Sequence, residues 1–128
     1  MTFRKLVSLA TVVCVGLLSV AGSARAEGKP ASVRGYVLDS ACAFIKDLKK
    51  PISTQCAVAC AKAGSPLVIL ADDGTLYWPI SESMPATGQN GRLMKFAGRK
   101  VVASGKVFEK GGSRALLIVN IAAVPGGK

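Results

Sequence analysis

Apolar and polar positions divide the chain into short segments that glycine, proline and aspartate separate. Five strands are predicted from this pattern, at residues 32–38, 66–71, 76–80, 100–108 and 115–124. Asp73-Gly74 and Gly111-Gly112 are typical of the tight turns that join antiparallel strands. Gly105 lies in the middle of the fourth strand and predicts a bulge or bend there.

Two helices are predicted between these strands. The first spans residues 53–63, because Ser53 can cap its free amides and Gly64 can adopt the left-handed conformation that ends it. The second is short, covers residues 92–96 and precedes the fourth strand. Residues 41–52 are predicted to form a loop with one helical turn.

The order of these elements predicts a mainly β fold. Five strands in about 100 residues, with a helix ahead of the fourth strand, suit a small five-stranded antiparallel barrel of the OB type with one or two short helices. The competing architecture is an open α+β sheet of four or five strands.

The amino-terminal residues 1–26 have the pattern of a cleavable signal peptide. Arg4 and Lys5 precede an apolar run over residues 6–20, and Ala24-Arg25-Ala26 supplies a cleavage site. The run is shorter than the roughly 20 residues that a bilayer span needs. We therefore expect a periplasmic or secreted protein without a membrane span, made of a mobile lead-in at 27–31 and one domain at 32–125.

The charge and the residue types narrow the expected function. The net charge of +10 favours anionic partners, such as an envelope component or an acidic protein, whereas export argues against nucleic acid. The surface expected to bind such a partner contains Arg92, Lys95, Arg99 and Lys100. The chain has no histidine, which excludes Ser-His-Asp and Cys-His catalysis, and no carboxylate pair suggests acid–base chemistry. An enzyme is therefore not expected, and the aspartates, Asp39 among them, are interpreted as turn formers and surface charges.

Cys42, Cys56 and Cys60 are the residues with the best prospect of specific chemistry. Side chains four residues apart on a helix have Cβ atoms about 5–6 Å apart, which is too far for an unstrained Cys56–Cys60 disulfide. We expect Cys42 to pair with one of the two, which stabilises the domain by roughly 3 kcal/mol. The remaining cysteine is then a free thiol.

Two other roles for these cysteines stay open. Three thiolates suit Cu(I) or Zn(II), and Met84 or Met94 could add a thioether ligand for copper. In a redox role, the position of Cys56 in the first turn of the helix lowers its thiol pKa, and its thiolate exchanges with a Cys42–Cys60 disulfide.

Three segments carry a resemblance to other proteins: Gly35 to Cys42, the Cys56-x-x-x-Cys60 helix with Gly64, and Phe96 to Gly105. Together they resemble a group of small exported bacterial proteins of unknown function. The resemblance implies an OB-like fold and an exported location. Similar proteins often carry a histidine shortly after the first cysteine, but residues 43–46 contain none, so a metal role that needs this histidine is not implied here.

The sequence thus predicts an exported, non-enzymatic binding or envelope-stability module with a structural disulfide. The alternative is a thiol-based protein that binds copper or zinc or exchanges redox equivalents. A count of free thiols and of bound metal distinguishes the two.

Overall fold

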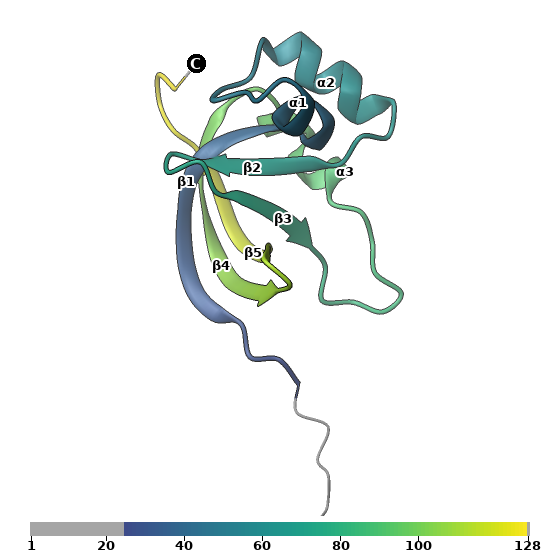
Figure 1. Ribbon diagram of the computed structural model, residues 1–128, viewed down its shortest axis with the longest axis vertical. Helices are drawn as coiled ribbons and strands as arrows, with labels where there is room; N and C mark the ends of the chain where they lie inside the picture. Colours follow the sequence, from purple (N-terminus) through teal and green to yellow (C-terminus); the bar gives the residue numbers. More distant parts are fainter. Residues whose placement is uncertain (1–24, 128) are drawn as a thin grey trace, which may run out of the picture.

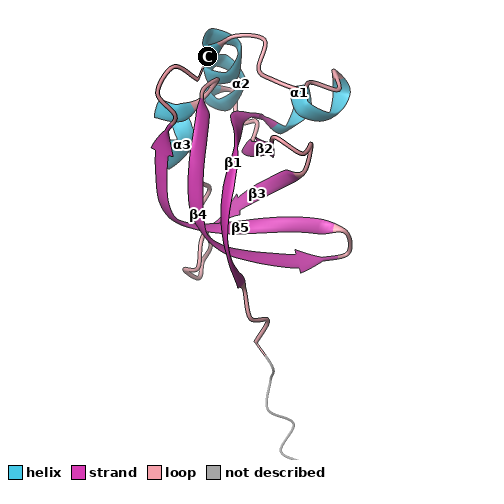
Figure 2. Ribbon diagram, turned by 90° about the vertical axis from the view of Figure 1, so that its left-hand side faces the viewer, coloured by secondary structure: helices cyan, strands magenta, loops and turns pink. Residues whose placement is uncertain are grey.

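The computed structural model describes residues 25–127 and shows a closed five-stranded barrel with short helices at one end (Figures 1 and 2). The strands are β1 (Lys29–Asp39), β2 (Leu67–Ala71), β3 (Leu76–Ile80), β4 (Lys100–Lys110) and β5 (Ser113–Ala123). Neighbouring strands follow the order β1-β2-β3-β5-β4, and β4 pairs with β1 to close the ring. The predicted small, mainly β, OB-like barrel is confirmed, and the open sheet is wrong.

One detail of the predicted barrel was wrong, because not every neighbouring pair of strands is antiparallel. Strand β3 pairs with β5 in parallel, with Tyr77 opposite Arg114 and Ile80 opposite Leu117. The reason is geometric: strand directions cannot alternate all the way around a closed ring with an odd number of strands. Five strands therefore require at least one parallel pair.

The first strand begins earlier than the sequence pattern indicated. Lys29 already pairs with Val107 of β4, so residues 29–31 of the predicted lead-in belong to the barrel. The pattern missed this extension because Lys29 and Pro30 are exposed and carry no apolar alternation. The antiparallel pairing of β1 with β4 continues from Lys29 along both strands.

Gly105 forms the predicted irregularity in β4. The register between β4 and β5 shifts between Ser104 and Gly105. A Cβ atom at residue 105 would collide with the backbone carbonyl of Leu117, so the close approach of the two strands requires glycine.

The helices are α1 (Ser40–Ile45), α2 (Thr54–Lys62), α3 (Asn90–Leu93) and the 3-10 helix η1 (Met94–Phe96). The predicted caps of α2 are confirmed: the Cys56 amide donates to Ser53 Oγ at 3.0 Å, and Gly64 has a φ of 103°. The segment predicted as a loop with one turn contains the six-residue helix α1. The predicted second helix is divided between α3 and η1.

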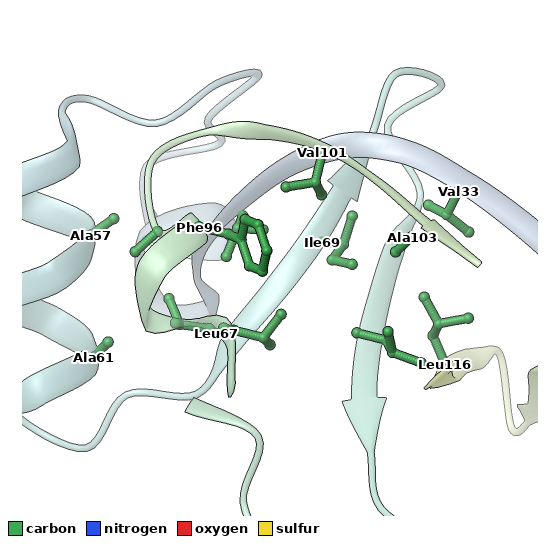
Figure 3. Close-up of a cluster of buried hydrophobic side chains, with 13 residues drawn as sticks. Val33, Ala57, Ala61, Leu67, Ile69, Phe96, Val101, Ala103 and Leu116 are labelled. Atoms are coloured by element: carbon green, nitrogen blue, oxygen red, sulfur yellow. The ribbon is translucent and has the colours of Figure 1, made fainter. Parts of the chain in front are cut away.

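Two clusters of buried apolar side chains hold the fold together. The main cluster fills the barrel and includes Ile69, Val101 and Leu116, which are fully buried. Figure 3 shows Ala57 and Ala61 pointing from α2 toward this cluster. A second cluster forms under α1, where Leu38, Ala43, Val68 and Leu70 pack with the partly buried Leu48, Leu76 and Trp78.

Most of the predicted signal peptide, residues 1–24, lies outside the described residues. Within residues 25–127, the helices are all too short to cross a membrane.

Candidate three-thiol site

Cys42, Cys56 and Cys60 meet at the helical end of the barrel. Cys42 comes from α1, and the other two lie one helical turn apart on α2. Their three Sγ atoms all lie within 4.8 Å of one another, each side chain is half-buried, and none of the three is disulfide-bonded in the structure. The cluster contains the three predicted cysteines, whereas the predicted pairing of Cys42 with a cysteine of α2 stays a prediction.

Asp39, the last residue of β1, positions Cys42. Its Oδ2 accepts from the Cys42 amide at 3.0 Å and so caps α1, and the Ser65 hydroxyl donates to the same oxygen at 3.3 Å. Asp39 is only 2% exposed. Its interpretation as a surface charge was therefore wrong: the carboxylate leaves water because these donors, which lie in separate segments of the chain, satisfy it.

The small side chains of α2 position the other two cysteines. Ala57 and Ala61 are buried against the barrel, and the cysteines precede them by one residue each, so they lie on the neighbouring face of the helix. Alanines on the barrel side let α2 pack closely without using the cysteines as core residues.

Asn90 ties the end of α2 to the barrel. Its amide nitrogen donates to the carbonyls of Ala61 at 3.2 Å and Ser65 at 2.8 Å, while its Oδ1 accepts from the Leu67 amide at 2.8 Å. Sequence reasoning missed this residue. It lies in a polar segment, and its partners are more than twenty residues away along the chain.

The surroundings of the cluster favour protonated thiols. A hydrogen bond to the Asp39 carboxylate, together with burial and the negative charge of Asp39, raises the pKa of Cys42 to about 12. Burial, and then the same charge, raises the pKa of Cys60. These two side chains are therefore neutral at neutral pH, which slows thiol–disulfide exchange and means that a metal ion must displace their protons.

Two hollows border the sulfur atoms. An apolar depression of about 270 Å³ is lined by Ala41, Ile45 and Ala63 together with Cys42 and Cys60. A narrow gap of about 10 Å³ separates Cys42 and Cys56 from the loop that contains Ile52. The sulfurs thus lie near the surface, with apolar side chains around them and the Asp39 carboxylate beside Cys42.

The described residues supply three candidate ligands at this site. Within residues 25–127, no aspartate or glutamate joins the cluster of three sulfurs that could hold an ion. The two methionines predicted as further copper ligands line neither hollow: Met84 is exposed in the loop after β3, and Met94 packs against the barrel core. A bound ion would thus be held by sulfur from cysteine.

The four basic residues predicted to bind an anionic partner differ in their contacts, and their role stays a prediction. Arg92 donates to the carbonyls of Ile118 at 2.7 Å and Val119 at 2.9 Å, and Lys100 forms an ion pair with Asp72 at 2.8 Å. Lys95 lies over the ring of Phe96. Arg99 lines a hollow of about 440 Å³ with Lys50.

Comparison with models of protein families, with curated proteins and with solved structures finds no match to this chain. The resemblance to small exported proteins therefore stays an expectation. The three sulfurs are the most specific feature in the geometry of the described residues.

Proposed function

We propose that this protein binds one soft metal ion, Cu(I) or Zn(II), between Cys42, Cys56 and Cys60. The observation that carries the proposal is the mutual approach of the three Sγ atoms to within 4.8 Å. A metal ion about 2.3 Å from each sulfur holds the sulfurs about 3.8–4.0 Å apart. Each pair therefore has to close by at most about 1 Å, which rotation of the side chains supplies.

Cu(I) suits this set of ligands better than Zn(II). Thiolates select soft ions such as Cu(I), and three sulfurs suffice for a three-coordinate copper ion, whereas zinc in structural sites takes four ligands. The nearest carboxylate, that of Asp39, already accepts hydrogen bonds from the Cys42 amide and the Ser65 hydroxyl. Its negative charge still favours a cation close to the sulfurs.

A titration of the reduced full chain tests this proposal. Cys14 is the fourth cysteine of the sequence, so Cys14→Ser is the matched control. We expect one Cu(I) per chain in competition with a chromogenic chelator, with Cys14→Ser unchanged. Single serine substitutions of Cys42, Cys56 and Cys60 should each weaken binding at least about tenfold, because each removes one of three ligands. Full binding by Cys42→Ser, or its loss in Cys14→Ser, would contradict the site.

A second candidate function follows from the same cluster. In it, the chain is an exported, non-enzymatic binding or envelope-stability module in which Cys42 forms a disulfide with Cys56 or Cys60. The short distances between sulfurs of separate helices support this candidate, because the bond would fix α1 to α2 and add roughly 3 kcal/mol to the stability.

Two measurements on the exported, unreduced Cys14→Ser protein separate the candidates. One free thiol and no metal supports the disulfide module, whereas three thiols and one bound ion support the metal site. The intact mass tests export at the same time, since cleavage leaves a chain that begins at Glu27. A mass that still includes residues 1–26 argues against the exported location.

A further inference from the structure

Residues 44–52, which are the last two residues of α1 and most of the loop that leads to α2, expose large apolar side chains beside the thiol site. Phe44 is 61% exposed, Ile45 84% and Ile52 60%. The other exposed large apolar side chains of residues 25–127 are scattered over β4, β5 and the loop after β3. This one segment therefore carries a concentration of apolar surface.

The segment is anchored to the fold from beneath. Leu48 packs into the second buried cluster, and Phe44 stacks on Trp78 of β3 with ring centroids 6.3 Å apart. Ile45 borders the larger hollow at the sulfurs and Ile52 the narrower one. Each of the two isoleucines thus borders a hollow that Cys42 also lines.

Positive charge surrounds these apolar side chains. The segment contains Lys46, Lys49 and Lys50 against a single acid, Asp47. Asp47 Oδ1 lies 3.8 Å from Lys49 Nζ, and both side chains are more than 80% exposed. This ion pair therefore offsets little of the positive potential of the segment. Lys50 also borders a hollow with Arg99, which adds a further cation nearby.

We propose that residues 44–52 dock on an anionic lipid surface. Ile45 and Ile52 enter the boundary between headgroups and acyl chains, and the three lysines bind the phosphate groups of the lipids. A lipid surface fits better than an acidic protein because the three apolar side chains, from the end of α1 and the loop after it, are each at least 60% exposed, so a continuous apolar layer can contact them. The proposal uses none of the sulfur atoms and does not rest on metal binding.

Trp78 provides a local readout of docking in the full chain. It is the only tryptophan of the sequence and stacks on Phe44, so lipids that quench its fluorescence must approach this segment. The probes are vesicles of phosphatidylglycerol and phosphatidylcholine, or of phosphatidylcholine alone, with brominated acyl chains. We expect quenching with the anionic vesicles, at least about tenfold weaker affinity for the neutral ones, and a decrease with salt.

Paired substitutions locate the surface. Ile45→Asp/Ile52→Asp should reduce quenching by anionic vesicles at least about tenfold, because it places charge where apolar contact is needed. Val119→Asp/Val102→Asp is the matched control, since it makes the same charge change at exposed apolar positions of β5 and β4 and should keep the quenching. The triple variant Lys46→Glu/Lys49→Glu/Lys50→Glu tests the charge alone. It also provides a second test of the same surface if the isoleucine variant does not fold.

Each other result overturns the proposal. If the isoleucine and lysine variants are quenched as strongly as the parent protein, this segment does not bind lipid. The same holds if both kinds of vesicle quench the parent protein equally. A change in Trp78 emission with poly-glutamate but not with vesicles assigns the surface to an acidic protein, and self-association without lipid assigns it to a second copy of the chain. Copper binding by a Lys49→Glu/Lys50→Glu variant, whose residues line neither hollow at the sulfurs, is measured alongside and should be unchanged, so failure here is distinguishable from failure of the metal site.

Discussion

The wall of the barrel and the helical cap over its end bury their side chains in different ways. We define the cap as α1, α2 and the loop between them, residues 40–62. In the wall, large aliphatic residues such as Val101 and Leu116 are fully buried between long strand ladders. In the cap, the buried residues are three alanines and Ser40, the cysteines are half-buried, and isoleucines are exposed.

This difference indicates that the wall provides the stability of the domain, whereas the cap carries the residues proposed to bind a ligand. The wall buries the apolar surface that holds the domain together, so it does not depend on the sulfur atoms. The alanines of α2 pack the cap onto that wall and leave the neighbouring face of the helix, with Cys56 and Cys60, available for a ligand. Substitutions in the wall should therefore unfold the protein, whereas substitutions at the sulfurs should change ligand binding.

The largest effect is expected in the wall. Leu116→Ala should lower the free energy of unfolding by about 2–5 kcal/mol, because it removes a fully buried side chain and leaves a cavity. Val119→Ala, on the same strand but 62% exposed, is the control and should change it by less than about 1 kcal/mol. Urea unfolding measures both. Equal losses in the two variants would contradict the division between wall and cap.

Copper should stabilise the cap through the sulfurs. With free Cu(I) at about 100 times its dissociation constant, binding adds about 2.7 kcal/mol to the reduced Cys14→Ser protein. Cys42→Ser in the same background should gain at most about 1.4 kcal/mol, because tenfold weaker binding leaves copper at about 10 times the dissociation constant. Its metal-free stability should differ by less than about 1 kcal/mol. Thermal unfolding with and without copper measures this. A large loss of stability in metal-free, reduced Cys42→Ser would show that the sulfurs belong to the core.

Asn90 tests how the cap is attached to the wall. Asn90→Ala removes three hydrogen bonds to backbone groups at the end of α2 and the start of β2, and should cost about 1–3 kcal/mol. It should also weaken copper binding, because α2 loses a contact that fixes its position. Asn120→Ala, at an exposed position of β5, should change neither property. Chemical unfolding and copper titration of both variants provide the comparison.

The smallest effect is expected from the charge beside the sulfurs, and at neutral pH it concerns the reactivity of Cys42 and not the stability of the fold. With a pKa of about 12 against an ordinary 9.0, Cys42 should alkylate at pH 8 on the order of a hundred- to a thousandfold more slowly than a free thiol. Asp39→Asn keeps a residue that can cap α1 but removes the charge, and so should speed this reaction. Mass spectrometry of the alkylated peptides measures the rates, and Asp72→Asn is the control.

The same shift has a consequence for stability at high pH. Because the folded pKa of Cys42 is raised, the unfolded chain loses its thiol proton first as the pH increases. The contribution to stability is therefore complete below about pH 9 and is lost as the pH rises through about 12. Reduced protein whose stability increased over this range would contradict the shift.

Local signals predicted much of the fold. The caps Ser53 and Gly64 defined α2, and Gly105 marked the bulge in β4. The parallel pairing of β3 with β5 was not visible, because it depends on how the ring closes and not on any segment. Helix α1 was underestimated because its capping residue, Asp39, also fits a turn at the end of a strand.

Of the three-thiol site, only the cysteines were predicted from the sequence. The spacing on one helix indicated that Cys56 and Cys60 share a face, and the loop after β1 was expected to bring Cys42 near them. The supports of the site, Asp39 and Asn90, were missed because they act through partners that only the folded chain brings together. Burial of a carboxylate against a hydroxyl 26 residues away leaves no pattern in the sequence.

The X-ray absorption spectrum of copper bound to the reduced Cys14→Ser chain tests the three-thiol site most directly, because it counts the atoms around the ion. A site built from Cys42, Cys56 and Cys60 predicts three sulfur neighbours at about 2.3 Å and one copper per chain. It also predicts that one sulfur is lost when Cys60 is replaced by serine. Two sulfurs in the parent protein, or a spectrum that Cys60→Ser leaves unchanged, would contradict it.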